Sequence, residues 1–585
     1  MNCPSRPDAD VHIEGWNQNP SDLAADTTTR NDLNHIANSR QQRGHRLDPT
    51  DPSLIDVVAV QQPEHTDSEH KNQKKSSGKK EYKATEQERD VAAMPTSLYG
   101  GSSGADGPSS PVMASLTRAR EILVKYSKFV GPGFMVAVAY IDPGNYATDV
   151  AAGATYRFKL LFIILMSNLF AIFLQALCVK LGTVTGMNLA ENCKAHLPSW
   201  LNYVLYFFAE SAIIATDIAE VIGTAIALNV LINVPLVAGC AISIVDVLII
   251  LLFYRPQNGS MKALRAFEFF VMALVLGVVI CFCFQLSLIE NTSVKEVFRG
   301  YLPSHAVVES KGLLQSCGIL GATVMPHSLY LGSGIVQPRL KEFDVRAGAI
   351  SPSHGDEDDP ALEKYRPSIS AIRACMKYSI IECAISLFTF ALFVNSSILI
   401  VAGASLSNTP AAEDADLFAI HDLLARTLAP VAGTIFALAL LLSGTSAGIV
   451  CTIAGQMVSE GQLNWTVAPW VRRLITRAIS ITPSIIIAGA VGKQGLSRAL
   501  EGSQVALSVI LPFVSAPLIY FTCRNSVMTV ATDGEGEVVG EGEARVFGGV
   551  KMRNGWVTIV VAGVIWGIIV VMNVALLVLV GLGIE

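Results

Sequence analysis

Eleven long apolar runs, separated by short polar segments, follow a polar first stretch of about 115 residues. Each run is close to the roughly 20 residues that a helix needs to cross a bilayer. We place them at about 127–150, 158–180, 201–223, 235–254, 267–289, 312–335, 374–402, 429–452, 472–492, 502–523 and 556–582. The pattern predicts an all-α polytopic membrane protein with 11 transmembrane helices.

Two of these runs, the first and the sixth, contain helix-breaking motifs near their middle. They are Asp142-Pro143-Gly144-Asn145 and Met325-Pro326-His327. Pro removes a backbone donor and Gly loosens a helix, so we expect both spans to unwind at mid-membrane. Breaks five spans apart are typical of two inverted five-helix repeats, here about 127–289 and 312–523. The run at 556–582 is then an additional helix.

The first segment, about 1–115, is polar and is predicted to be a disordered cytoplasmic tail. It contains a lysine-rich run at 71–80 that could touch anionic lipids or be a target of modification machinery, or be merely solvated. No apolar signal-peptide core occurs in it, so we expect the first span to direct insertion. The second domain, 116–585, would be the transmembrane transporter domain.

Composition supports a membrane location. The 585 residues are 51% hydrophobic and 16% charged, with a mean hydropathy of +0.44, whereas soluble domains are about 25% charged. Lys and Arg concentrate in the loop between the sixth and seventh runs, which predicts a cytoplasmic N-terminus. A glycosylation sequon at Asn291 then falls outside, and those at Asn258 and Asn464 fall inside. Plasma, endosomal and vacuolar membranes all fit this orientation, and nothing indicates nucleic-acid binding.

The two breaks also carry the residues most suited to binding an ion. A carboxylate at mid-membrane, such as Asp142, usually marks a transport path, although a structural salt bridge is the alternative. The kink frees carbonyls such as that of Ala139, and Asn145 adds an amide oxygen. Met325 would be core filler in an intact helix, but in an unwound segment its sulfur becomes a ligand that favours transition metals over Ca²⁺ and Mg²⁺.

The third run carries three acids, Glu210, Asp217 and Glu220, within about 80° of one helix face. Three acids on one buried face predict a proton relay or a water-lined path, or else partners for a basic helix. Candidate partners at the start of the ninth run are Arg472, Arg473 and Arg477, which could equally be ordinary flanking residues. His327 could carry protons on the same path or be a neutral buried histidine.

Three segments together resemble the signatures of the NRAMP family of proton-coupled divalent-metal transporters. They are Ala139–Asn145, Ala322–His327 and Asp217–Glu220, and the resemblance covers about residues 120–582. It implies a LeuT-like fold and import of Mn²⁺ or Fe²⁺ as transported substrate, without a resident cofactor. The metal site it implies comprises Asp142, Asn145, Met325, the carbonyls of Ala139 and Ala322, and Gln504. The proton route it implies comprises His327, Glu210, Asp217, Glu220, Arg472, Arg473 and Arg477.

The chain departs from the family pattern at Thr445, where Gln is usual, and at Ser328 and Gly332, as in the fungal branch. A metal-sensing receptor and an amino-acid symporter of the same fold are the alternatives to metal import. An enzyme is disfavoured, because the chain has no His-Glu-x-x-His motif and no P-loop.

Overall fold

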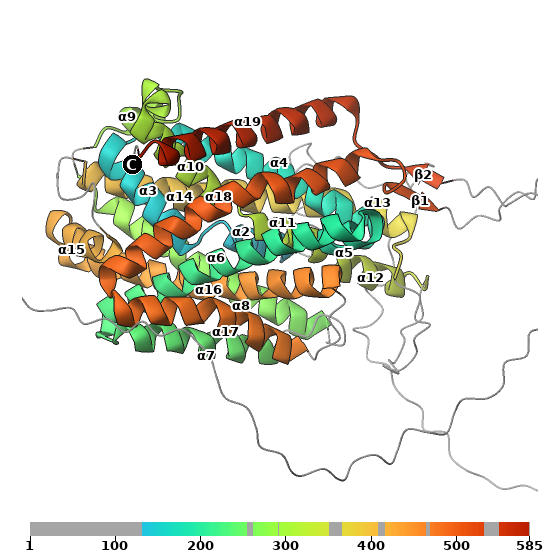
Figure 1. Ribbon diagram of the computed structural model, residues 1–585, viewed down its shortest axis with the longest axis horizontal. Helices are drawn as coiled ribbons and strands as arrows, with labels where there is room; N and C mark the ends of the chain where they lie inside the picture. The colour runs from blue at the N-terminus through green and yellow to red at the C-terminus, as the bar shows by residue number, and fades with distance from the viewer. Residues whose placement is uncertain are drawn as a thin grey trace, which may run out of the picture. The chain divides into compact units, whose positions relative to one another are not determined.

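The computed structural model describes residues 131–253, 261–290, 292–349, 365–407, 416–463, 469–531 and 549–583 (Figure 1). The predicted tail, its lysine-rich run and the sequons at Asn258, Asn291 and Asn464 lie outside these residues.

The described residues are almost entirely helical, and two short strands form the one hairpin seen among them. In chain order the elements are α2 (Pro132–Val138), α3 (Pro143–Tyr156), α4 (Leu161–Thr185), α5 (Leu189–His196), α6 (Ser199–Ile232), α7 (Leu236–Phe253), α8 (Met261–Ser287), α9 (Val294–Arg299), η2 (His305–Val308), α10 (Ser310–Thr323), α11 (Pro326–Gly334), α12 (Gln337–Arg346), α13 (Ile369–Ser386), η3 (Leu387–Ala391), α14 (Leu392–Ser405), α15 (Leu417–Thr427), α16 (Pro430–Leu463), α17 (Pro469–Ala490), α18 (Lys493–Cys523), β1 (Thr529–Ala531), β2 (Gly549–Lys551) and α19 (Trp556–Gly581).

Eight helices or helix runs among the described residues are long and apolar enough to cross a membrane: α4, α6, α8, α10–α12, α13–α14, α16, α18 and α19. Each apolar run predicted from the sequence coincides with a helix or an interrupted helix pair. Several helices extend beyond the predicted runs, because polar residues continue the helix past the apolar part. The clearest case is α16, which ends at Leu463.

Both predicted breaks are present, and in each one the proline explains why the helix is interrupted. Pro143 begins α3 and Pro326 begins α11, each at the first helical position, where a missing N–H costs nothing. The preceding half-helices end at Val138 and Thr323. Figure 1 shows α2 and α3 as separate pieces of one interrupted span.

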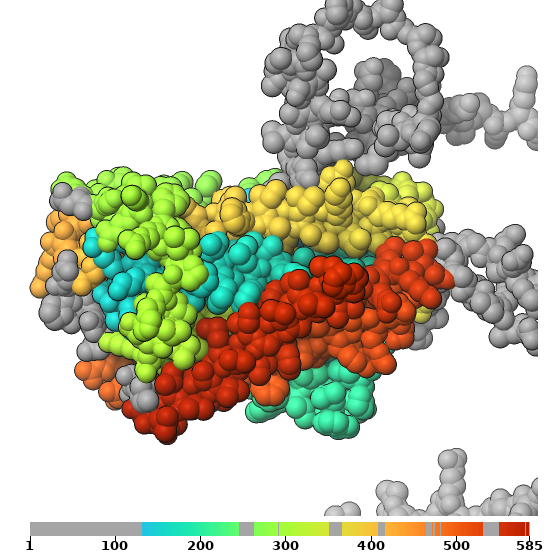
Figure 2. Space-filling view, turned by 90° about the horizontal axis from the view of Figure 1, so that it is seen from above, coloured from blue at the N-terminus to red at the C-terminus, as the bar shows by residue number. Residues whose placement is uncertain are grey.

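The long helices α6 and α16 pack against each other, and α3 packs mainly against α14. Small residues permit such close approaches. A Cβ at Gly182 of α4 would lie 1.9 Å from the carbonyl oxygen of Ser333 on α11, and one at Gly223 of α6 would lie 2.4 Å from Pro143. In Figure 2, α19, drawn in red, runs across the surface of the bundle. It contacts α18 and α10.

The start of α2 is held by charged groups from three other elements. Glu382 of α13 accepts hydrogen bonds from the backbone N–H groups of Gly131 (2.8 Å) and Gly133 (3.0 Å). Beside it, Arg339 of α12 forms a buried ion pair with Glu268 of α8 at 3.2 Å. A carboxylate at a helix N-terminus is favourable, so these contacts fix the half-helix that precedes the first break.

Residues just before α13 fix the end of α12. Asp344 of α12 accepts hydrogen bonds from the Tyr365 hydroxyl (2.8 Å) and from the Ser368 backbone N–H (3.0 Å). Burial, together with the nearby Asp344, raises the pKa of Tyr365, so its hydroxyl stays protonated and donates. Ser368 in turn caps α13 by accepting from the Ala371 N–H at 3.0 Å.

Candidate metal centre

In each break the proline deprives one particular backbone carbonyl of its usual helical donor. Pro143 stands four residues after Ala139, and Pro326 stands four residues after Ala322. Proline has no N–H, so neither carbonyl can receive an i→i+4 hydrogen bond. Both alanines are buried. The sequence thus presents two carbonyl oxygens at matching positions of the two broken helices.

Asp142 caps the N-terminus of α3 and is fully buried. Its Oδ1 accepts from the backbone N–H of Asn145 at 3.1 Å, and its Oδ2 accepts from that of Gly144 at 3.2 Å. The helix dipole also favours a negative charge here. The first break therefore stabilises a carboxylate that would otherwise be costly at this depth.

The amide of Asn145 lies at the point where oxygens from both breaks converge. Its Nδ2 donates to Asp142 Oδ1 (2.6 Å), to the carbonyl of Tyr140 (3.2 Å) and to the carbonyl of Ala322 (3.3 Å). The amide N–H groups thus already hydrogen-bond the oxygens that a cation would bind. For a cation to take that place, the amide must turn and present Oδ1 instead. In this orientation Oδ1 accepts from Thr323 at 3.5 Å.

Met325 is fully buried and occupies the N-cap position of α11, which corresponds to that of Asp142 in the first break. Its sulfur lies 4.0 Å from the Thr216 hydroxyl, which also donates to the Ala212 carbonyl at 2.9 Å. The same hydroxyl lies 3.3 Å from Nδ1 of His327. Thr216 of α6, which the sequence analysis missed, therefore links the thioether to the histidine.

Gln504 of α18 approaches the first break through Gly144. A Cβ at Gly144 would lie 2.3 Å from Gln504 Nε2, so the glycine lets this amide lie directly against the break. Gln504 Nε2 donates to the Ser503 hydroxyl at 3.1 Å, while Oε1 is buried without a partner among the described residues. The structure thus brings Asp142, Asn145 and the Ala322 carbonyl together, with Gln504 against Gly144 of the same break. Met325 follows Ala322 by three residues in the second break.

The acidic face of α6 divides into two parts. Arg477 of α17 forms an ion pair with Asp217 and lies 3.6 Å from Glu220. All three side chains are buried. Glu210 lies elsewhere on α6, because seven residues of helix separate it from Asp217 by about 10.5 Å; it is half-buried. The side chains of Arg472 and Arg473 lie outside the described residues.

The thiol of Cys451 lies close to the same acids, within 4.8 Å of ligand atoms of Asp217 and Glu220. A guanidinium already pairs with these carboxylates, so the cluster is an ion-pair site. His327, predicted for the same route, has a buried Nε2 without a hydrogen-bond partner among the described residues. Thr216, which contacts His327, directly precedes Asp217 in α6, and the two side chains point about 100° apart around the helix.

A polar cluster joins the two breaks, and the sequence analysis did not predict it. The Tyr140 hydroxyl lies 2.9 Å from the Ser328 hydroxyl. Gln175 of α4 donates to Tyr140 (2.9 Å) and to the Ser328 carbonyl (3.0 Å). A Cβ at Gly332 would lie 1.9 Å from Gln175 Oε1, so the glycine there leaves space for this amide. An isolated Gln within the apolar run of α4 was the signal that could have indicated it.

Two further hydrogen bonds satisfy carbonyls of the first break. Asn395 of α14 donates to the Tyr140 carbonyl at 3.1 Å, and Ser443 of α16 donates to the Ile141 carbonyl at 2.9 Å. Asn395 follows the π-helical turn η3, which shifts the register of the helix. Thr445, the departure noted above, is half-buried on α16. The freed backbone is therefore held by side chains from neighbouring helices.

Comparison with known proteins assigns this arrangement to one family. The chain is 52% identical over 503 residues to the manganese transporter SMF1 of Saccharomyces cerevisiae, covering 79% of this chain and 87% of that one. It is 54% identical over 412 residues to the iron transporter SMF3 of the same yeast, covering 70% and 84%. The divalent metal cation transporter MntH of Xanthomonas campestris is 40% identical over 68% of this chain and 83% of its own length.

A solved structure shares the fold. The Eremococcus coleocola manganese transporter superposes with a TM-score of 0.62 at 29% identity, covering 80% of this chain and 88% of that chain. A family profile described as natural resistance-associated macrophage protein-like matches residues 133–539, which include both breaks and the α6–α17 ion pair. The chain therefore belongs to the Nramp family of membrane transporters.

Proposed function

We propose that this protein imports divalent transition-metal ions, Mn²⁺ and Fe²⁺ first among them, into the cytosol together with protons. The observation that supports this best is that Asp142 and the Ala322 carbonyl, one from each broken helix, meet at the amide of Asn145. A carboxylate, carbonyls, an amide and one thioether suit a borderline transition metal better than Ca²⁺ or Mg²⁺. The names of the relatives point the same way.

In this proposal Asp142 supplies the charge and Asn145 turns its amide to supply an oxygen. The carbonyls of Ala139 and Ala322 complete the site from the two helix ends, Met325 supplies the sulfur and Gln504 supplies a further oxygen. The set contains no imidazole or thiolate cage, so the ion can leave again. We propose no resident cofactor and no enzymatic reaction; the metal is the substrate.

Protons would use His327, Glu210, Asp217 and Glu220, with the arginines at positions 472, 473 and 477 as counter-charges. The contact of Thr216 with both Met325 and His327 supports a link between the two routes. Such a contact would let occupancy of the metal site act on the acids of α6, since Thr216 and Asp217 are adjacent.

The transport cycle we propose is alternating access by two inverted repeats. It requires 11 crossings of the bilayer, with α2–α3 and α10–α11 as the discontinuous helices of the two repeats and α19 added. The N-terminus would be cytoplasmic, in the plasma, endosomal or vacuolar membrane, where an acidic outside supplies protons. Each imported elementary charge gains about 2.3 kcal/mol per 100 mV of inward-negative potential.

Uptake of Mn²⁺ into proteoliposomes should be faster with an outside pH of 5.5 than of 7.5, because the proton gradient then drives the same direction of movement. Radioactive or fluorescent Mn²⁺ assays measure this directly. Mn²⁺ binding without uptake at either pH would indicate a metal sensor instead. Uptake of small amino acids in place of Mn²⁺ would indicate the symporter alternative.

Replacing Met325 by alanine should reduce discrimination against Ca²⁺ about tenfold while leaving Mn²⁺ uptake measurable. The sulfur is the soft ligand of the proposed site, and losing a preference worth about 1.4 kcal/mol corresponds to that factor. The measurement is inhibition of Mn²⁺ uptake by Ca²⁺. Met135 is equally buried and lies in α2, so Met135→Ala serves as the matched control. An unchanged Ca²⁺ inhibition constant in Met325→Ala would contradict the proposed ligand.

A further inference from the structure

One buried acid on α3 has no role in the site described above. Asp149 is fully buried, and among the described residues no donor reaches either of its carboxylate oxygens. The other buried acids of the described part have partners: Asp217 and Glu220 pair with Arg477, Glu268 pairs with Arg339, and Glu382 and Asp344 accept hydrogen bonds. A buried carboxylate without a partner is costly, so its presence requires a reason.

The position of Asp149 relates it to the metal centre. Seven residues separate it from Asp142, the N-cap residue of α3, so Asp149 lies about two turns, or about 10.5 Å, further along the helix axis. Tyr146 lies between them on α3, packed against Phe282 and Phe436 with ring centres 5.6 Å apart in each case. An aromatic cluster thus separates the two acids in this conformation.

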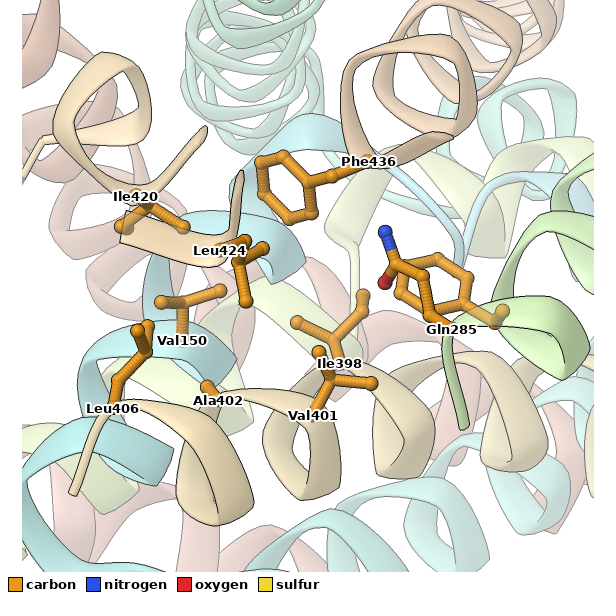
Figure 3. Close-up of a pocket in the computed structure, with 10 residues that line it drawn as sticks. Val150, Gln285, Ile398, Val401, Ala402, Leu406, Ile420, Leu424 and Phe436 are labelled. Carbon is orange, nitrogen blue, oxygen red and sulfur yellow. The ribbon is translucent and has the colours of Figure 1, made fainter. Parts of the chain in front are cut away.

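The residue after Asp149 on α3, Val150, lines a small cavity. Val150 lines it together with residues of α8, α14, α15 and α16, among them the same two aromatic residues, Phe282 and Phe436 (Figure 3). The cavity has no space for a water-sized sphere. Its lining is apolar apart from Gln285, whose Nε2 donates to the Ala432 carbonyl at 3.2 Å while Oε1 is buried without a partner. Figure 3 shows this amide among the apolar side chains.

Asp149 itself is fully buried, and among the described residues no hydrogen-bond donor reaches its carboxylate. The helix packed most extensively against α3, α14, carries no charged residue. Such a group avoids the cost of burial by carrying a proton, or by meeting a cationic partner at another stage of the transport cycle, when the cavity between α3, α8 and α16 is open. In a transporter of divalent cations the transported ion can be that partner.

We propose that Asp149 is a second, transient binding site for the incoming divalent cation, on the outer side of the Asp142 site. This proposal rests on the proposed function and on the cytoplasmic N-terminus. With the cavity open, the hydrated ion pairs with Asp149. It then passes Tyr146 to Asp142, and the aromatic cluster closes behind it. An acid at this position concentrates cations before the selective site acts.

The first test is Mn²⁺ uptake by wild type, Asp149→Asn, Asp149→Glu and the control Thr155→Val. Thr155 lies on another face of α3, where it accepts from Gln315 at 3.1 Å. Asp149→Asn should raise the KM for Mn²⁺ roughly fivefold, change kcat less than twofold and lose the dependence of KM on ionic strength. Asp149→Glu should retain that dependence, and Thr155→Val should resemble wild type.

The outcomes separate this proposal from the proposed function. If wild type fails to transport Mn²⁺, the proposed function fails, whatever Asp149 does. If wild type transports but Asp149→Asn keeps the wild-type KM and salt dependence, the second site is refuted. A fall in kcat alone would likewise refute it, since it would assign Asp149 a structural role.

A second measurement does not depend on the stability of the asparagine variant. Carbodiimide modification of wild type and of Asp142→Ala, followed by peptide mass spectrometry, reports on Asp149 directly. Mn²⁺ should protect Asp149 in both chains, because the second site does not need Asp142. Protection in wild type alone would show that Asp149 only senses occupancy of the main site. Absence of modification in every condition would show that the cavity never opens to it. Either result would overturn the proposal.

Discussion

Mn²⁺ uptake should fall roughly 100-fold when Asp142 is replaced by asparagine, a loss of about 3 kcal/mol at 1.4 kcal/mol per factor of ten. Asparagine caps a helix about as well as aspartate, so α3 should still form. It cannot supply the negative charge that offsets dehydration of a divalent ion. The measurement is initial uptake at equal amounts of folded protein, beside equilibrium Mn²⁺ binding.

Asp416 provides the matched control for this substitution. It also caps a helix, α15, by accepting from the Ala419 N–H at 2.8 Å. Asp416→Asn makes the same chemical change at a helix start away from both breaks and should leave uptake within twofold of wild type. If Asp142→Asn retained wild-type uptake, Asp142 would be a structural cap and the metal would bind elsewhere.

Replacing Arg477 by alanine should destabilise the protein by about 3–5 kcal/mol, because it leaves two buried carboxylates without their cation. Thermal unfolding in detergent measures the loss. Protonated carboxyl groups need no counter-charge, so the folded variant should bind more protons than the unfolded chain. The loss of stability of the variant relative to wild type should therefore grow as pH rises. Mn²⁺ uptake by the variant should lose its stimulation by an acidic outside.

Arg524 supplies the comparison for Arg477. Its guanidinium lies 4.8 Å from the ring centre of Tyr520 at the end of α18, and the side chain is exposed. Arg524→Ala should change stability by about 0.5 kcal/mol or less, as exposed substitutions usually do. If Arg477→Ala were as stable as Arg524→Ala at neutral pH, the ion pair would not be the counter-charge that the structure indicates.

The broken helices were predictable from sequence because their cause is local. Pro143 and Pro326 remove hydrogen bonds wherever they stand, and the apolar length on each side sets the span. Ala139 and Ala322 follow from the same prolines by counting four residues back. Asp142, Asn145 and Ala322, three members of the predicted set, lie around one point, and their roles as metal ligands stay a prediction.

Contacts between distant helices were not predictable in this way. Thr216 looks like any small polar residue of an apolar helix until Met325 and His327 are placed beside it. The three acids of α6 share a face, but the sequence does not show that Arg477 reaches Asp217 and Glu220 while Glu210 lies two turns away. The sequence analysis did not identify Asp149, because only the structure shows that its described neighbours offer it no hydrogen-bond partner.

The hydrogen bonds of Asn145 have a consequence for how quickly an ion is released. In this structure its amide nitrogen contacts Asp142 and Ala322, so an arriving ion would displace this amide. That exchange lowers the net affinity without weakening any single ligand bond. When the ion departs, the amide can swing back and occupy the oxygens, which hinders immediate rebinding. A transporter in which an amide of the protein competes with the ion can bind that ion selectively and still release it.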